Sequence, residues 1–476
     1  MGTEIKFGTD GWRGIIADGF TFERVRRIAP IVGEVLYSQR QWETYQIVVG
    51  YDRRFLSAEF AGAVAEELQK VGFDVLLADS FAPTPAFSWS AFALKTLGAI
   101  VITASHNPYQ YSGLKIKGSF GGSVGKEITN LVEAKLSQGD NFTLPRTGTV
   151  TKFNPWANYV QELQNKVDIK LIQSLVASQT LTIYADAMHG SAAGGLAKLL
   201  GVSVHELHSQ TDPLFGGKAP EPLAKNLSEL ITTVASSNTP LAVGFAFDGD
   251  SDRIACIDGS GAFLSSQFLI PILTQHLVEH HHKKGAFIKT ISGSDLMQKV
   301  AETYNLPVYE TPVGFKYLAK QMLQTKTVIA GEESGGIGYG DHIPERDALL
   351  SALYLLETIA VTKTNLLDLY RQLQAKVGYY FSYDRIDQHL SSPQAVEKVY
   401  QELATNPPSA IADIPVISVS NPDGFKFRLA NQGWLLVRFS GTEPVLRMYC
   451  EAPTKTEVSS ILEWIQTLVN RICRTT

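Results

Sequence analysis

The sequence is poor in cysteine, in net positive charge and in long apolar runs. Its three cysteines are odd in number and far apart, which argues against a disulfide framework or a cysteine-based zinc site. The net charge of −5 gives no basic field that would attract nucleic acid or an acidic membrane surface. The chain has no run of about 18 apolar residues and no signal-peptide pattern at its start. These absences predict a cytoplasmic protein without a nucleic-acid or membrane partner.

The composition instead favours a large globular protein. Apolar residues make up 44% of the chain and charged residues 19%, which excludes a disordered or fibrous class. A length of 476 residues exceeds what one core can organise, so several domains are expected. Short apolar runs alternate with stretches of helical spacing, which predicts an α/β fold with buried strands. These runs are QIVVGYDRR, LGAIVITASHNP, LTIYADAMHG, LAVGFAFDGD and TVIAGEESGG.

Polar and turn-rich segments predict where the domains meet. Such segments lie at 137–150, at 257–263 and near 372–380. The last part of the chain has a hairpin pattern, GWLLVRFSGTEPVLRMYCEA, followed by a helical pattern from about 454 to 473, which is typical of a small α+β domain. The expected division is three mixed α/β domains and one α+β domain, at residues 1–148, 149–259, 260–374 and 375–476.

The loop DGDSDR follows an apolar run and carries three alternate carboxylates, Asp248, Asp250 and Asp252. Alternate side chains of an extended segment point the same way, so three hard oxygen donors would converge, as Mg²⁺ requires. An EF-hand is excluded because its sixth position needs glycine and its twelfth glutamate, whereas Arg253 and Gly259 stand there. The alternative is a solvated acidic turn.

Ser105 lies in the loop TASHNP at the end of another apolar run. It could act as a nucleophile, but no G-x-S-x-G elbow surrounds it, so an ordinary serine hydrolase is not expected. Its neighbour His106 would point away in an extended segment, so His106 is a poor candidate for the base and a better one for contacting a phosphate or shaping the loop. The alternative is a serine that caps a turn.

Two further loops carry polar groups. GEESGG lets the backbone approach a ligand and offers Glu332 and Ser334 to sugar hydroxyls, although a plain surface loop would have the same composition. RFSGTEPVLR could clamp an oxyanion with two guanidinium groups, two hydroxyls and free backbone N–H groups, or could be a hairpin with incidental arginines. The candidate clamp residues are Arg438, Ser440, Gly441, Thr442 and Arg447.

In this order, TASHNP, DGDSDR, GEESGG and RFSGTEP resemble the α-D-phosphohexomutases, the family of phosphoglucomutase and phosphomannomutase. The resemblance extends over nearly the whole chain. Supporting matches are FGTDGWRG (7–14), PEPLAKNL (220–227), TPVGFKY (311–317) and PERDALL (344–350). The family implies four domains around a central cleft.

The resemblance also implies roles for these residues. Ser105 would carry a phosphoryl group, whose oxygen completes a Mg²⁺ shell begun by the three aspartates. Arg13 and Lys115 would flank that phosphate, with Lys115 as the proton shuttle and His106 beside the phosphate. Residues that would bind the substrate are Arg253, Lys316, Glu332, Ser334, Arg438, Ser440, Gly441, Thr442 and Arg447. Glucose 1-phosphate would become glucose 6-phosphate through glucose 1,6-bisphosphate, on an enzyme that is a monomer or weak dimer.

Several alternatives stay open at this point. GEESGG is closer to glucose-preferring relatives than to the GEMSGH type, since Gly336 stands where that type has histidine. Phosphomannomutase or dual specificity, glucosamine phosphates, and a hexose 1,6-bisphosphate synthase would nevertheless use the same loops. A Mg²⁺-dependent phosphatase and a non-catalytic phosphosugar sensor are rivals from other classes. The run of histidines at 280–282 is expected to be a solvated helix end.

Overall fold

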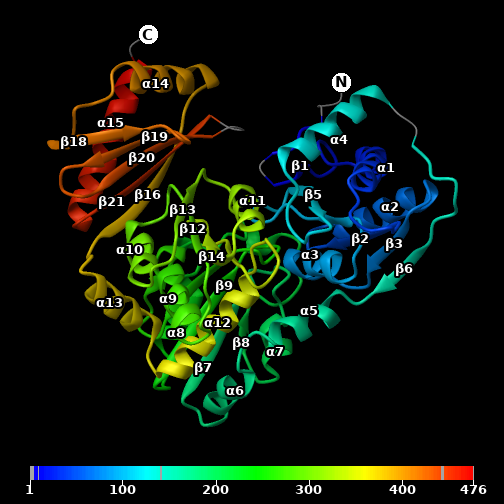
Figure 1. The fold of residues 1–476 in the computed structure, drawn as a ribbon, viewed down its shortest axis with the longest axis horizontal. Helices are drawn as coiled ribbons and strands as arrows, with labels where there is room; N and C mark the ends of the chain where they lie inside the picture. Colours follow the sequence, from blue (N-terminus) through cyan, green and yellow to red (C-terminus); the bar gives the residue numbers. More distant parts are fainter. Residues whose placement is uncertain (1–4, 9, 140–141, 441–443, 475–476) are drawn as a thin grey trace.

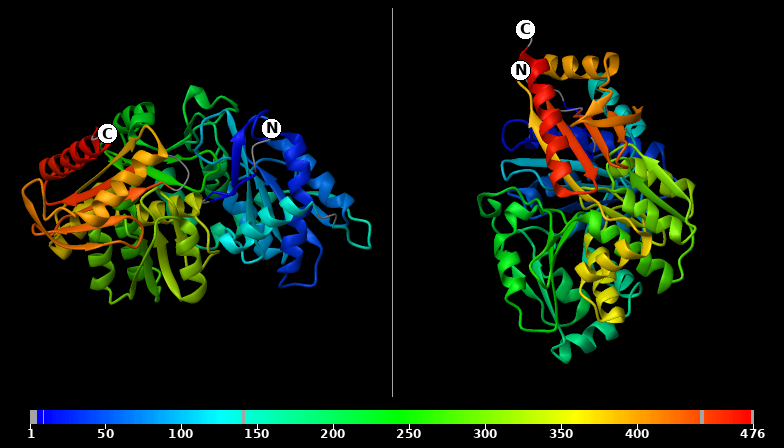
Figure 2. Two further views of the ribbon diagram at one scale, coloured as in Figure 1. Left: turned by 90° about the horizontal axis from the view of Figure 1, so that it is seen from above. Right: turned by 90° about the vertical axis from the view of Figure 1, so that its left-hand side faces the viewer.

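A computed structural model describes residues 5–8, 10–139, 142–440 and 444–474. In these residues the chain forms four sheets, one after another along the sequence (Figure 1). The first sheet and the last lie at opposite ends of the molecule, and the view from above in Figure 2 shows the same arrangement. The expected fold class, three mixed α/β domains and a smaller α+β domain, is confirmed.

The first sheet has six strands in the order β1-β5-β4-β2-β3-β6. Its strands are β1 (Trp12–Ile15), β2 (Gln46–Tyr51), β3 (Asp74–Ala78), β4 (Gly98–Ile102), β5 (Tyr111–Gly118) and β6 (Val150–Phe153). Its helices are α1 (Phe22–Ser38), α2 (Ser57–Lys70), α3 (Thr84–Ala93) and α4 (Lys126–Gln138). Strand β4 is apolar along its whole length because both faces of the sheet are covered. The sheet runs past the expected boundary at 148 to include β6, which pairs with β3.

The second sheet has the order β11-β10-β9-β7-β8. Its strands are β7 (Leu181–Asp186), β8 (His205–Leu207), β9 (Leu241–Phe247), β10 (Ile254–Asp258) and β11 (Phe263–Leu264). Its helices are α5 (Pro155–Gln164), α6 (Ile169–Ala177), α7 (Gly195–Leu200) and α8 (Ser228–Ala235), with short 3₁₀ turns η1 (Phe215–Gly217) and η2 (Ala224–Asn226). Strands β9 and β10 pair antiparallel, so the connection between them is the tight loop that holds the aspartates.

The third sheet has the order β13-β12-β14-β15. Its strands are β12 (Ala286–Thr290), β13 (Val308–Thr311), β14 (Thr327–Gly331) and β15 (Ile337–Tyr339). Its helices are α9 (Ser266–Glu279), α10 (Asp295–Thr303), α11 (Phe315–Gln324), α12 (Ala348–Thr362) and α13 (Leu366–Val377). Helix α12 is apolar on nearly all sides because it is buried, and its side chains belong to one core that also includes residues of the second sheet.

The fourth sheet is antiparallel, with the order β16-β21-β20-β19-β18-β17. Its strands are β16 (Ser382–His389), β17 (Ala410–Ile411), β18 (Ile414–Ser420), β19 (Phe425–Leu429), β20 (Trp434–Phe439) and β21 (Val445–Ala452). Helices α14 (Pro393–Thr405) and α15 (Lys455–Arg474) pack against each other, and α15 covers β16 and β21. This domain has its own apolar core. Along the whole described chain, every helix is too short or too polar to cross a membrane.

Candidate active site

Ser105 follows strand β4, and its backbone is in the left-handed region, with φ of +52°. Its N–H donates to Thr103 Oγ1 at 2.9 Å, and its hydroxyl donates to Asp248 Oδ2 at 2.7 Å. A residue other than glycine in this conformation carries strain of about 1–3 kcal/mol that its surroundings must offset. The side chain is therefore held at the carboxyl end of a strand, aimed at the second domain.

Arg54 supplies much of that support. The guanidinium is buried and donates to four backbone carbonyls of the serine loop, those of Ser105, Asn107, Pro108 and Tyr111. Its Nε lies 3.2 Å from Asp52 Oδ2, and this oxygen also accepts a hydrogen bond from Thr103 Oγ1 at 2.6 Å. Arg54 thus satisfies buried carbonyls that the turn leaves without helix or sheet partners.

His106 and Arg13 complete the serine loop. The expectation that His106 points away from Ser105 is wrong, because the left-handed serine places His106 Nδ1 3.3 Å from the serine Oγ. Burial, and the positive charges of Arg253 and Arg13, lower the pKa of His106 well below its usual range, so the imidazole is neutral. Arg13 lies opposite Gly113 in the pairing of β1 with β5, and its guanidinium donates to Asn107 Oδ1.

The loop after β9 brings Asp248, Asp250 and Asp252 together. All three are fully buried, and one carboxylate oxygen from each lies within 4.8 Å of the others. Asp248 Oδ1 accepts the N–H groups of Asp252 and Arg253 at 3.0 and 3.1 Å, which fixes the turn. Burial, and repulsion by the carboxylates of Asp252 and Asp250, raise the pKa of Asp248 well above its ordinary value.

Gly249 allows this loop to reach the serine loop. A Cβ at this position would lie 2.5 Å from the carbonyl oxygen of Ser105, closer than non-bonded atoms can approach. The obstacle is backbone, which cannot rotate away as a side chain could. The glycine of DGDSDR is thus required for close packing of the two loops.

Two buried cationic side chains, Lys115 and Arg346, lie against the aspartates. Lys115 Nζ contacts carboxylates of Asp10, Asp250 and Asp252 at 2.7, 2.8 and 2.9 Å. Burial alone would lower the pKa of Lys115, but these three carboxylates raise it above its ordinary value, so the ammonium keeps its proton. Arg346 Nη2 donates to Asp252 Oδ2 at 2.5 Å and to Asp10 Oδ2 at 2.8 Å.

The donor set of the loop fits Mg²⁺. Lys115 and Arg346 engage the Oδ2 atoms of Asp250 and Asp252, while both Oδ1 atoms are buried and accept no hydrogen bond from the described residues. Arg253 Nε lies 3.9 Å from the Oδ1 of Asp252. Such orphaned carboxylate oxygens are costly unless a cation neutralises them, and hard oxygens are the ligands that Mg²⁺ prefers.

The loop GEESGG is joined to the same network. Glu332 is buried, accepts the hydroxyl of Ser334 at 2.7 Å and pairs with Arg346 at 3.1 Å. Gly335 has a φ of +97°, and an isolated bridge pairs Gly336 with Arg253. The sugar-reading candidates Glu332 and Ser334 are therefore linked to the aspartate loop through Arg346.

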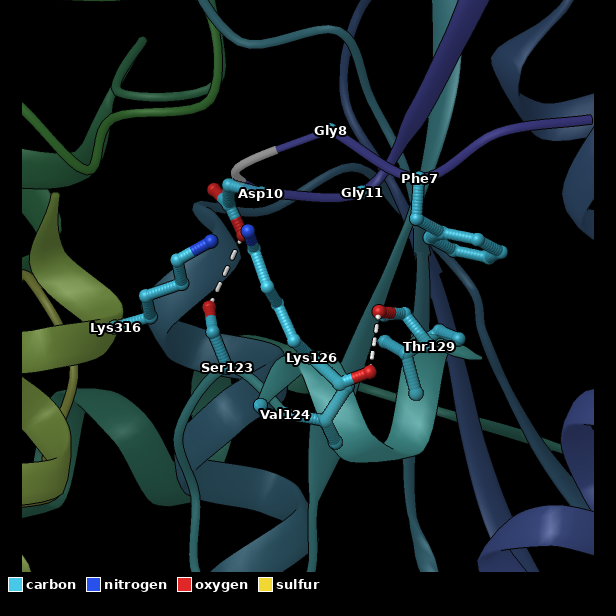
Figure 3. Close-up of a pocket in the computed structure, with 11 residues that line it drawn as sticks. Phe7, Gly8, Asp10, Gly11, Ser123, Val124, Lys126, Thr129 and Lys316 are labelled. Carbon is cyan, nitrogen blue, oxygen red and sulfur yellow. Dashed lines mark hydrogen bonds between the residues drawn. The ribbon is translucent and has the colours of Figure 1, made fainter. Parts of the chain in front are cut away.

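Lys316 lines a small pocket together with Asp10, Ser123 and Lys126. Figure 3 shows the ammonium groups of Lys316, from α11, and Lys126, from α4, both pointing toward Asp10. Ser123 Oγ donates to Asp10 Oδ1 at 3.1 Å. Burial, and the neighbouring Lys126 charge, lower the pKa of Lys316 below its usual value. A ligand anion would relieve this crowding of positive charge.

The candidate phosphate clamp lies on β20 and β21, where Arg438 pairs directly with Arg447. Arg438 Nε donates to Asp423 Oδ2 at 2.9 Å, and Arg447 Nε lies 3.8 Å from Asp387 Oδ2. Ser440 N–H donates to the Val445 carbonyl at 3.0 Å and so closes the base of the loop. Gly441 and Thr442 lie outside the described residues. The clamp therefore sits in the fourth domain, paired with carboxylates of that domain.

Four residues of the network had no role assigned from the sequence: Asp10, Arg54, Thr84 and Arg346. Asp10 and Arg346 lie in the supporting matches FGTDGWRG and PERDALL, which was the available signal. Thr84 opens α3, and its hydroxyl donates to Asp250 Oδ2 at 2.6 Å. The contact between Asp10 and Arg346 could not be predicted from helix or strand periodicity, because it joins residues far apart in the sequence.

Known proteins match this chain over nearly all of its length. Residues 4–142, 157–261 and 265–377 match alpha/beta/alpha domains I, II and III of phosphoglucomutase/phosphomannomutase, and residues 387–466 match its C-terminal domain. The chain is 28% identical to a phosphoglucomutase/phosphomannomutase of Thermococcus kodakarensis, over 96% of both chains. It is 28% identical to a phosphoglucosamine/phosphogalactosamine mutase of Sulfurisphaera tokodaii, over 97% of this chain and 98% of that one. A Thermus thermophilus protein assigned as a phosphomannomutase has a TM-score of 0.85 and 31% identity, covering 99% of this chain and 100% of that one.

Proposed function

Because the chain belongs to the α-D-phosphohexomutases, the family of phosphoglucomutase and phosphomannomutase, we propose that it interconverts glucose 1-phosphate and glucose 6-phosphate through phospho-Ser105. The enzyme class is that of the mutases, isomerases that move a phosphoryl group on a phosphosugar. The observation that carries the proposal is the hydrogen bond from Ser105 Oγ to Asp248 Oδ2 at 2.7 Å. Arg54 holds the serine loop in the position that allows this contact. The relatives give no support to the phosphatase alternative, since they are named as mutases.

In the proposed reaction the bond between phosphorus and Ser105 Oγ breaks as a sugar hydroxyl bonds to the same phosphorus. The departing Ser105 Oγ needs a proton as the sugar hydroxyl loses one. Lys115 is the proposed shuttle, and because its ammonium is already protonated, it takes up the hydroxyl proton only as it releases one of its own toward the serine. Arg13 and His106 contact the phosphoryl group, and Arg54 holds the serine carbonyl. Bound to the three aspartates and a phosphate oxygen, Mg²⁺ would supply charge neutralisation. Positioning and electrostatics are the main demands of phosphoryl transfer.

Arg438, Ser440, Gly441, Thr442 and Arg447 are proposed to hold whichever phosphate is not reacting. Glucose 1,6-bisphosphate forms after the first transfer and turns around, so each of its phosphates occupies this clamp in turn. Two guanidinium groups in direct cross-strand pairing suit a dianion, since Arg binds phosphate bidentately. Arg253 and Lys316 add positive charge nearer the aspartate loop.

Glu332 and Ser334 are proposed to hydrogen-bond to the sugar hydroxyls and so to select the sugar. Gly336 is part of this selection, because a Cβ there would meet Arg346 Cδ at 2.2 Å and displace the side chain that orients Glu332. Glucose is the proposed sugar, as GEESGG matches glucose-preferring relatives. Glucosamine phosphates are the second candidate, since a relative is named as a phosphoglucosamine/phosphogalactosamine mutase.

A coupled assay tests the proposal with glucose 1-phosphate, mannose 1-phosphate and glucosamine 1-phosphate, each with and without added glucose 1,6-bisphosphate. We expect the highest kcat/KM with glucose 1-phosphate, and faster onset with bisphosphate because it primes Ser105. Preference for glucosamine 1-phosphate would overturn the sugar assignment alone. Bisphosphate as the main product would indicate a synthase, and release of inorganic phosphate would overturn the mutase proposal.

A further inference from the structure

A second group of metal-type ligands lies outside the site described above, where the end of α9 meets the middle of α12. His276 Nε2 and His281 Nε2 lie 2.7 and 2.6 Å from the same oxygen, Glu357 Oε2. One ligand atom from each residue lies within 4.8 Å of the others. The expectation that the histidine run is a solvated helix end is therefore wrong for His281, which packs against a buried glutamate.

The local backbone explains why these imidazoles gather. His276 and His280 are four residues apart at the end of α9, which places them on one helix face, and their rings stack 5.0 Å apart. The His281 N–H donates to the His276 carbonyl at 3.3 Å, so the chain turns back over the helix end. The His281 ring then packs edge-on against His276 at 5.1 Å and against Tyr354 at 5.3 Å.

The carboxylate of Glu357 is oriented toward the imidazoles. Its Oε1 accepts the backbone N–H of Asp168 at 2.7 Å, which leaves Oε2 facing His276 and His281. Its side chain is 1% exposed, whereas His280, whose Nε2 lies 3.9 Å from Oε1, is 41% exposed and opens the cluster to solvent. Carboxylates that bind metal ions are commonly held in place by a hydrogen bond of this kind.

We propose that His276, His281 and Glu357 bind a divalent transition-metal ion of the Zn²⁺ type, with His280 or water as the fourth ligand. Tetrahedral Zn²⁺ holds nitrogen and carboxylate oxygen at about 2.0–2.2 Å, so its ligands are about 3.3 Å apart. The two imidazoles need only withdraw by less than about 1 Å from Oε2 to reach that spacing. The imidazole nitrogens also distinguish the ligand set of this site from that of the aspartate loop, whose ligands are all oxygens and therefore suit Mg²⁺.

A metal here would join three elements of the chain. His276 and His281 belong to α9 and the turn after it, Glu357 belongs to α12, and Asp168 is the N-cap of α6. Figure 1 shows α9 and α12 side by side in the third domain, and α12 also contacts α6. Because the folded chain alone assembles these ligands, bound metal would stabilise it by mass action.

The test measures Zn²⁺ binding by titration calorimetry on tag-free protein in excess Mg²⁺, which is added to fill the proposed magnesium site at the aspartate loop. The variants are His281→Ala, whose side chain is partly exposed, and Glu357→Gln, which keeps an acceptor for the Asp168 N–H. The matched control is His205→Ala, an exposed histidine on β8. Thermal unfolding with and without Zn²⁺, and the visible absorption of bound Co²⁺, are the second and third readouts.

We expect one Zn²⁺ per chain, a higher Tm with Zn²⁺, and binding at least about tenfold weaker in His281→Ala, with His205→Ala unchanged. Equal Zn²⁺ binding in wild type and His281→Ala would overturn the proposal. So would the absence of saturable binding, or binding that is lost in Asp250→Ala but kept in His281→Ala. In those cases Glu357 is only a buried hydrogen-bond acceptor for two imidazoles.

Discussion

At the scale of single residues, the site depends on close approach between loops from different domains. Ser105 could be recognised from the sequence because it follows an apolar run, and so could the alternate aspartates. The position of His106 could not, because the extended backbone assumed for the serine loop is replaced by a left-handed serine. The contacts of Arg346 with Asp10 and Asp252 were also hidden, since they depend on tertiary packing over more than 90 residues of sequence.

Gly249→Ala tests the close approach of these two loops. The new Cβ would meet the Ser105 carbonyl at 2.5 Å, so one loop must shift and turnover should fall by about 10²-fold, the scale for misplacing reacting groups by about 1 Å. The control Gly62→Ala adds a methyl group in helix α2 with nothing within 4 Å and should leave kcat unchanged. Full activity in Gly249→Ala would show that the loops tolerate separation.

Asp250→Asn tests the role of the carboxylates in the aspartate loop. The change keeps an acceptor for Thr84 but removes the charge that Lys115 and a cation would share. We expect kcat to fall on the order of 10²-fold or more and the Mg²⁺ requirement to rise, in line with losing one electrostatic stabiliser. Wild-type turnover that persists in EDTA would contradict the metal assignment.

At the scale of elements, the sequence was a reliable guide to strands. All five apolar runs quoted from the sequence contain strands, namely β2, β4, β7, β9 and β14, and α15 spans Lys455–Arg474 where a helix from about 454 to 473 was expected. Continuous apolar runs bounded by polar turns are decisive when both sheet faces are covered. The antiparallel addition of β1 to β5, which places Arg13, depends on pairing between distant segments and could not be read locally.

Strand β19 carries a buried lysine whose titration should affect stability. Lys426 Nζ donates to the Ile291 carbonyl at 2.6 Å and lies over the Trp434 ring. Burial, and the neighbouring Lys289 charge, lower the pKa of Lys426 from 10.5 to about 8. The unfolded chain then binds more protons between these two values, so stability should rise with pH across that window, by on the order of 3 kcal/mol at most.

Lys426→Met isolates this effect. The variant lacks the buried charge, so its Tm should exceed that of wild type below about pH 8, and the difference should shrink toward pH 10.5. Thermal unfolding of both proteins over this range measures it. A Tm difference that stays constant with pH would show that Lys426 titrates normally.

At the scale of the whole molecule, the fourth domain, which carries the candidate phosphate clamp, contacts the third domain, including its loop GEESGG. Asp423 Oδ2 accepts both the Arg438 guanidinium and the Val313 N–H at 2.9 Å, and the Tyr449 hydroxyl donates to Glu333 at 3.1 Å. The four-domain order followed from the sequence motifs, whereas these contacts between domains did not, because they depend on how finished domains pack. The exact domain boundaries stay a prediction.

Arg447→Ala tests the clamp in both directions of the reaction. Both phosphates of the bisphosphate must occupy the clamp in turn. The transition state should therefore lose about 2–4 kcal/mol of stabilisation, and forward and reverse kcat/KM should both fall accordingly. The control is Arg371→Ala, an exposed i,i+3 pair with Asp368 on α13 that should change neither rate. Because the equilibrium constant fixes the ratio of forward to reverse kcat/KM, the deciding measurement is single-turnover transfer from phospho-Ser105 to glucose 1-phosphate and to glucose 6-phosphate separately. Slower transfer to only one of the two sugars would contradict a bisphosphate that turns around.

The most direct measurement is the phosphorylation state of Ser105 during turnover. Protein incubated with Mg²⁺ and isotopically labelled glucose 1,6-bisphosphate should gain one phosphoryl group, and peptide mass spectrometry should place it on Ser105. Addition of unlabelled glucose 1-phosphate should move the label into glucose bisphosphate and glucose 6-phosphate, and Ser105→Ala should show neither event. Label on another residue, or label released mainly as inorganic phosphate, would contradict the account.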